Sequence, residues 1–206
     1  LNTTLTAGDI FKGGDGTDTF SLTSDLGANT TLSGFTTESV ENFNVNLLSG
    51  AAAAHVLTVN MLNSAPTTIN LQGTTVTNAA DWATFTNVAA GTNLSVANST
   101  DLDATVTYLA AARAGTADEA TLTLNTVANT AAADTDITYT SGGTAATSIN
   151  TLNVATTGAA SNIGNLAFGG TTLNVTGDQN FDVDDDLEVT IDLIDASAFT
   201  GNLDIA

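Results

Sequence analysis

The stretch that decides the fold is Gly13–Ser21, which reads Gly-Gly-Asp-Gly-Thr-Asp-Thr-Phe-Ser. It fills every fixed place of the nonapeptide G-G-x-G-x-D-x-U-x, a repeat of parallel β-helices in which U is a large apolar residue. The glycines permit the positive φ angles of a tight turn, and Phe20 is placed to point inward as the chain leaves this turn as a strand. The stretch therefore predicts a parallel β-solenoid.

The same turn offers the oxygen ligands of a calcium site. Ca²⁺ prefers carboxylates and main-chain carbonyls. The carboxylate is that of Asp18, and the main-chain oxygens lie around Gly13, Asp15 and Gly16. Asp9 holds the matching place in the preceding stretch, which reads as a degenerate copy without the glycine pair. A plain glycine turn that leads into a strand is the alternative interpretation.

In a regular calcium roll, this turn would share its ion with a second turn of the same chain. In a roll with two nonapeptides per coil, the ion is shared with the turn two nonapeptides further along the chain. Here that turn is at 31–36, which contains Gly34 but no Asp. The ion therefore needs ligands from other turns, and the nearby candidates are Asp9, Asp25, Glu38 and Glu41.

The rest of the chain repeats a weaker unit, in which an apolar, a small polar and an apolar residue are bracketed by Thr or Asn. Such period-two units at near-regular intervals, separated by turns rich in Gly and Asn, predict short stacked strands. The units begin at Phe20, Phe43, Ile69, Leu94, Val106, Leu122, Ile137, Leu152, Leu173, Val189 and Leu203.

The composition favours a solenoid over a sandwich. Aromatic residues make up only 5% of the 206 residues, so the interior must be built from small aliphatic side chains. Repeated Asn and Thr are expected to form ladders down an outer face of such a stack. A Thr-rich β-sandwich is the alternative fold. Two segments fit no strand unit, and we expect short helices or wide loops at Leu47–Val56 and Asn78–Val88.

The charge is strongly one-sided. There are 22 acidic residues against 2 basic ones, which gives a formal net charge of −20. Nucleic acids and anionic membrane surfaces would be repelled, whereas divalent cations would relieve the self-repulsion of the compact chain. No apolar run is long enough to cross a bilayer, so we expect no membrane insertion. The chain has no Cys, which excludes disulfides and thiol metal sites.

A second acidic cluster lies at Phe181–Glu188. In an extended strand Asp182, Asp184 and Asp186 project to one side, where their charges repel one another unless a cation or solvent separates them. We therefore consider both an oxygen-ligand cation site and a solvated acidic turn. The sixth and twelfth loop positions lack the Gly and Glu of an EF-hand, which excludes that motif.

The sequence offers few candidate catalytic residues, and we expect that the protein is not an enzyme. His55 is the only histidine and has no Cys to pair with, so no nucleophile–base signature is present.

Three Thr-x-Thr pairs, which begin at Thr105, Thr121 and Thr138, could stack on one outer face as in ice-binding solenoids. Threonine is also common on any exposed strand.

Four segments together resemble the repeat-in-toxin-related surface-layer proteins and large calcium-binding adhesins of Gram-negative bacteria. They are Ala7–Ile10, Gly13–Phe20, Ser39–Val45 and Ile194–Leu203. The resemblance implies type I secretion, calcium-dependent folding outside the cell, and self-association into a lattice or filament at the cell surface. It also leaves cell-surface polysaccharide as a further partner.

The function expected on this basis is that of a non-catalytic structural protein of a bacterial surface layer. A calcium-stabilised adhesin or filament segment is the alternative, and a polysaccharide-active β-helix enzyme is a third class. We expect residues 1–206 to form one continuous solenoid segment of a longer chain, with any weak seam near residue 90.

Overall fold

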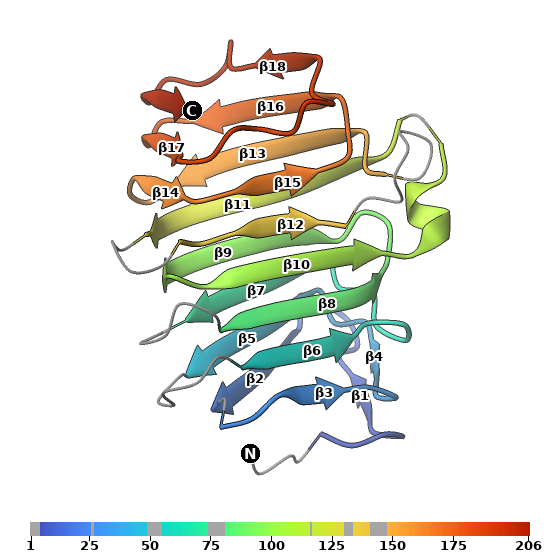
Figure 1. The fold of residues 1–206 in the computed structure, drawn as a ribbon. Coiled ribbons are helices and arrows are strands. Elements are labelled where there is room, and N and C mark those ends of the chain that lie inside the picture. The colour runs from blue at the N-terminus through green and yellow to red at the C-terminus, as the bar shows by residue number, and fades with distance from the viewer. Residues whose placement is uncertain are drawn as a thin grey trace.

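The computed structural model describes residues 5–25, 27–48, 55–73, 81–115, 117–129, 134–140 and 148–206. Within these ranges the chain winds into a stack of coils that begins with the blue strands and ends with the red ones (Figure 1). No helix in the described part is long and apolar enough to span a membrane.

One wall of the solenoid is an eight-stranded sheet, in which every neighbouring pair of strands is parallel. Its strands, in spatial order, are β2 (Thr19–Asp25), β5 (Asn42–Leu48), β7 (Thr68–Gly73), β9 (Asn93–Thr100), β11 (Glu119–Ala128), β13 (Thr151–Thr157), β16 (Thr172–Gly177) and β18 (Leu193–Asp195).

The facing wall is a six-stranded parallel sheet. Its strands are β3 (Thr30–Leu32), β6 (Val56–Asn60), β8 (Trp82–Val88), β10 (Asp103–Tyr108), β12 (Ile137–Tyr139) and β15 (Leu166–Phe168). The chain alternates between the two walls, so two strands in sequence make most of one coil (Figure 1).

Two short parallel sheets close the sides at the ends of the stack. One pairs β1 (Ile10–Lys12) with β4 (Thr36–Glu38), and the other joins β14 (Ser161–Ile163), β17 (Phe181–Val183) and β19 (Leu203–Ile205). A single turn of 3₁₀ helix, η1 (Ala110–Arg113), lies between β10 and β11. All named strand pairs are parallel, which confirms the solenoid and excludes the antiparallel sandwich.

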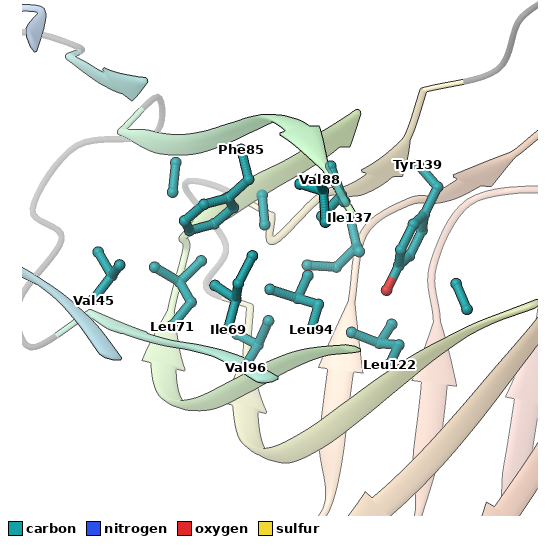
Figure 2. Close-up of a cluster of buried hydrophobic side chains, with 14 of the residues drawn as sticks. Val45, Ile69, Leu71, Phe85, Val88, Leu94, Val96, Leu122, Ile137 and Tyr139 are labelled. Carbon is teal, nitrogen blue, oxygen red and sulfur yellow. The ribbon is translucent and has the colours of Figure 1, made fainter. Parts of the chain in front are cut away.

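The core is a column of apolar side chains between the two walls. Alternate residues of each strand point inward, and Figure 2 shows Leu71, Leu94 and Val96 of one wall facing Phe85 and Val88 of the other. Each of these side chains is at most 1% exposed. Burying a side chain of this size contributes roughly 1.5–3 kcal/mol, so the repeated inward positions supply most of the driving force.

Four phenylalanines cluster at the N-terminal end of this core. Phe20 is in edge-to-face contact with Phe11 at a centroid distance of 4.7 Å and lies 5.0 Å from Phe43, which in turn is 5.9 Å from Phe35. The inward orientation of Phe20 predicted from the nonapeptide is therefore confirmed.

Ten of the eleven predicted strand units lie on strands, and one prediction is wrong. Val189 is in a turn and is 98% exposed. The strand of that coil is β18 instead, because Leu193 is the residue that pairs with Thr172 of the coil below. The three-residue unit at 189 has the strand pattern, but backbone pairing selects the next apolar pair along the chain.

The helices or wide loops expected in the first half are corrected where the structure describes them. Residues 82–88 of the second segment form strand β8, because Ala83, Phe85 and Val88 point into the core. The first segment contributes the end of β5 and the start of β6, and its alanine run Ala51–Ala54 lies outside the described residues.

The predicted amide and threonine ladders are present on the outer faces. Asn70 donates to Asn44 Oδ1 and Asn174 donates to Asn153 Oδ1, both at 2.8 Å. The Thr105 and Thr138 pairs adjoin in the six-stranded sheet, as predicted. Thr121 does not join them, because it lies on the opposite wall.

The threonine row continues on the other side of Thr105, through strands that the Thr-x-Thr pattern did not suggest. Thr84 of β8 pairs with Thr105 on one side and with Thr58 on the other, and Thr31 pairs with Thr58.

Both walls continue through residue 90, where a weak seam was considered, since β7 pairs with β9 and β8 with β10.

Candidate functional site

The glycine turn lies against the next coil of the solenoid. Strand β1 ends at Lys12 and β2 begins at Thr19, so residues 13–18 connect two strands that pair with β4 and β5. The Gly13 amide donates to the Glu38 carbonyl at 2.9 Å, and the Glu41 amide donates to the Asp18 carbonyl at 3.2 Å. The turn that faces the nonapeptide is therefore residues 39–41, and not residues 31–36 as a two-nonapeptide coil requires.

This difference follows from the length of the coil. Thr19 pairs with Asn42, and Asn42 pairs with Thr68, so each coil here is longer than two nonapeptides. The extra residues form β3 and β4, which make the second wall and a side of the coil. A calcium ion at this turn would consequently take its additional ligands from the β4–β5 connection.

Oxygen atoms from both coils converge beside Gly13. A Cβ atom at this position would overlap the main-chain oxygen of Ser39 and lie 2.7 Å from Asp18 Oδ2. Asp18 Oδ2 is shielded from solvent and has no hydrogen-bond partner. Glu41 Oε2 accepts a hydrogen bond from the Asp18 amide at 2.7 Å, which brings a second carboxylate to the same turn.

These oxygen ligands fit a hard cation. A buried carboxylate oxygen that accepts no hydrogen bond costs free energy unless a cation or a proton binds to it. The carboxylates of Asp18 and Glu41 and the carbonyl of Ser39 are the ligand types that Ca²⁺ selects. Among the described residues no three acidic or imidazole side chains lie close enough to hold a metal by themselves. Carbonyl oxygens and water would therefore complete the shell.

The remaining predicted ligands of the first site are spread over a wider area. Asp9 precedes β1, and its Oδ2 accepts hydrogen bonds from the Thr6 amide and hydroxyl at 2.7 and 3.1 Å. Asp15 and Gly16 lie in the exposed tip of the turn, where Gly16 has the predicted positive φ of 117°. The structure thus brings Asp18 to Glu41 and leaves Asp9 at the other end of the strand.

The second acidic cluster is divided by the end of β17. Asp182 and Asp184 lie on one side of the chain, as predicted, and both accept hydrogen bonds from Asn162 Nδ2, at 2.9 and 3.2 Å. Asn129 donates to Asp184 at 3.0 Å. Asp186 is exposed and borders a different depression at the end of the stack. The three carboxylates therefore do not form one group.

Asp182 and Asp184 line an open depression of about 710 Å³ on the side of the solenoid, which we call the acidic depression. Its described polar lining comprises Asn129, Asp134, Ser161, Asn162, Asn180, Asp182 and Asp184. Asp204 also pairs with Asp182 on the neighbouring strand, and like charges in that position repel one another.

A row of acids beside this depression was missed by the sequence reasoning. The pKa of Asp103 is raised to about 6, mainly by burial and also by the nearby charges of Asp136, Asp134 and Asp101, while a hydrogen bond from the Asp136 amide partly opposes the rise. That hydrogen bond is 2.8 Å long. Burial also raises the pKa of Asp136, with the charges of Asp134 and Asp185 adding to the effect.

The sequence contained a signal for this row. The pairs Asp101–Asp103 and Asp134–Asp136 have the same Asp-x-Asp spacing and stand at the start of neighbouring strands of one wall. The coil-to-coil register brings them together, and that register cannot be read from either pair alone.

His55 directly precedes strand β6. Its amide donates to Asp81 Oδ1 at 2.8 Å, and its Nδ1 is shielded from solvent without a hydrogen-bond partner. Ser64 Oγ accepts a hydrogen bond from the Thr37 amide at 3.2 Å.

The fold class is thus a parallel β-solenoid with a candidate cation site at its first glycine turn. Comparison of the chain with protein-family profiles, with curated protein sequences and with solved structures finds no match.

Proposed function

We propose that this chain is a non-catalytic structural protein of a bacterial surface layer, exported by a type I system and folded with Ca²⁺ outside the cell. The observation that carries the proposal is the solvent-shielded Asp18 oxygen, which has no partner and lies beside Gly13 and the turn of the next coil. The G-G-x-G-x-D-x-U-x pattern and the parallel solenoid support the same function.

Charge supplies the folding mechanism. At a net charge of −20 the chain repels itself where Ca²⁺ is scarce, which keeps it extended and competent for export. Outside the cell, an ion bound only by the folded state stabilises that state by about 2.7 kcal/mol at a concentration one hundred times its dissociation constant. Bound ions would also let acidic neighbours associate into a lattice.

The test is a calcium titration of the purified chain, followed by circular dichroism and by thermal melting. We expect Ca²⁺ to raise the melting temperature, Mg²⁺ to have a much smaller effect, and Asp18→Asn to remove most of the calcium response. Asp178→Asn is the matched control, because it removes the same charge from an exposed position away from the turn. A melting curve that does not change between excess chelator and excess Ca²⁺ would refute the proposal.

Assembly separates the surface layer from the alternative of an adhesin segment. Two-dimensional arrays that form with Ca²⁺ and dissolve in chelator would support the surface-layer function. A chain that binds Ca²⁺ but stays monomeric at all concentrations would indicate the adhesin instead. Sedimentation and electron microscopy of negatively stained samples distinguish the two outcomes.

A further inference from the structure

The outer face of the eight-stranded sheet contains a groove of about 340 Å³, which we call the amide groove. It crosses the first four strands of that sheet, β2, β5, β7 and β9. Its lining consists of seven Ser, Thr, Asn and Gln residues, Ala97, and the core-facing residues Leu22, Val45 and Leu71 that alternate with them. The volume is in the range of small-ligand sites, at the lower end of roughly 300–1,000 Å³.

Two rows of polar side chains in strict register form the groove. One row runs through Ser21, Asn44, Asn70 and Ser95, and the other runs from Thr23 through Asn46 to Gln72. Parallel strands place successive members of a row about 4.8 Å apart. The groove therefore presents the same chemistry repeatedly along the solenoid axis, which suits a ligand that repeats as well.

None of the described residues that line the groove is charged, in a chain with 22 acidic residues. A cation would find no carboxylate there, and an anion would be repelled by the net charge of the protein. The described part of the lining also holds no aromatic residue that could anchor an apolar ligand. These features select a neutral, strongly hydrogen-bonding ligand.

The amides of the groove have hydrogen-bonding capacity left over. Asn70 Nδ2 donates to Asn44 Oδ1 at 2.8 Å, which fixes both amide planes and leaves the Asn44 donors and the Asn70 oxygen for a ligand. Asn46 Oδ1 is shielded from solvent and has no donor. If the amide rotates toward a ligand hydroxyl, this oxygen gains a donor, which recovers the cost of leaving it unpaired.

We propose that the amide groove binds a neutral oligosaccharide or polysaccharide chain. Sugar hydroxyls both donate and accept hydrogen bonds, as do the amides and hydroxyls that face them. An extended peptide is disfavoured, because peptides that bind sheets add to a strand edge and place side chains in apolar pockets. The proposal rests on the groove alone and holds whether or not the chain binds Ca²⁺.

The test measures binding of the full chain to dextran, laminarin and mannan by affinity electrophoresis and calorimetry, with alginate as the anionic comparison. We expect at least one neutral glycan to bind, alginate to be excluded, and 0.5 M NaCl to leave the affinity unchanged. Asn70→Leu and Gln72→Ala should each weaken binding at least tenfold.

The matched control is Asn174→Leu. Asn174 forms the same 2.8 Å amide pair with Asn153 on the same wall, but it lies outside the groove, so this variant should bind as the parent does. Melting curves of each variant would verify that it is folded. The proposal fails if none of the three neutral glycans is retained, or if Asn174→Leu weakens binding as much as Asn70→Leu. Binding that is lost in 0.5 M NaCl would also overturn the proposal, because such binding would be ionic.

Discussion

Replacing Asp103 with Asn should stabilise the protein at neutral pH. Asp103 begins strand β10 and lies among Asp101, Asp134 and Asp136, so its ionised form is opposed both by burial and by three like charges. Asn keeps the side-chain oxygen that accepts the hydrogen bond from the Asp136 amide. The substitution therefore removes the charge and preserves the contact.

The magnitude follows from the difference between the folded and unfolded pKa values. The folded pKa is about 6 and the unfolded value is 3.8, so the native state holds its proton more tightly. The stability that this proton provides is full below pH 3.8 and is lost as pH rises through 6. Each pKa unit corresponds to 1.36 kcal/mol. Since the group is partly exposed and screened by solvent, we expect a gain of about 1–2 kcal/mol for Asp103→Asn.

The assay is chemical denaturation of both proteins between pH 4 and pH 8 in calcium-free buffer. The stability difference should be close to zero at pH 4, grow between pH 4 and pH 6, and stay constant above. For a domain of this size, 1 kcal/mol shifts the melting temperature by about 2–4 °C. Asp178→Asn should show no such rise, because Asp178 is exposed. A difference that does not vary with pH, or a less stable Asp103→Asn protein at pH 7.5, would refute the reasoning.

Two further predictions concern the turn and the core. Gly13→Ala should destabilise the chain by roughly 2 kcal/mol or more in a urea titration, because the new methyl group would overlap the main chain of the next coil, whereas Gly27→Ala, with open space around it, should change little. Phe85→Ala should cost about 3–5 kcal/mol by leaving a cavity between the two walls. Leu62→Ala is its control, since Leu62 is 59% exposed, and equal losses for the two would contradict the assignment of Phe85 to the core.

Local patterns predicted the strands well where the inward residues were large and evenly spaced. Leu122 and Leu152, for example, begin units that lie on adjacent strands of one wall. The pattern failed at Val189 and at β8, since period-two alternation does not state which of several apolar pairs meets the coil below. Residues 78–88 were expected to form a short helix or a wide loop because they fit no strand unit, although Phe85 and Val88 fill the core.

The candidate site was predictable in its chemistry but not in its partners. The residues Gly13–Asp18 could be read directly, because the glycine spacing dictates a turn that gathers oxygens. Glu41 was one of four candidate ligands, and only the coil length determines that Glu41, and not another of the four, lies against Asp18. That length depends on β3 and β4, whose three-residue strands carry almost no periodic signal. The same dependence on register hid the acidic row at Asp103 and Asp136.

The parallel stacking of the walls has a consequence for how this protein can vary. Each strand pairs only with the strands of the coils directly above and below it, so no contact in the walls depends on how many coils the stack contains. Stability in such an array is a sum of coil terms and nearest-neighbour terms. A whole coil could be duplicated or deleted at a small cost, provided that the inward residues on either side still match. The length of the solenoid along its axis can therefore change with the number of coils, while its cross-section is set by the number of residues in one coil.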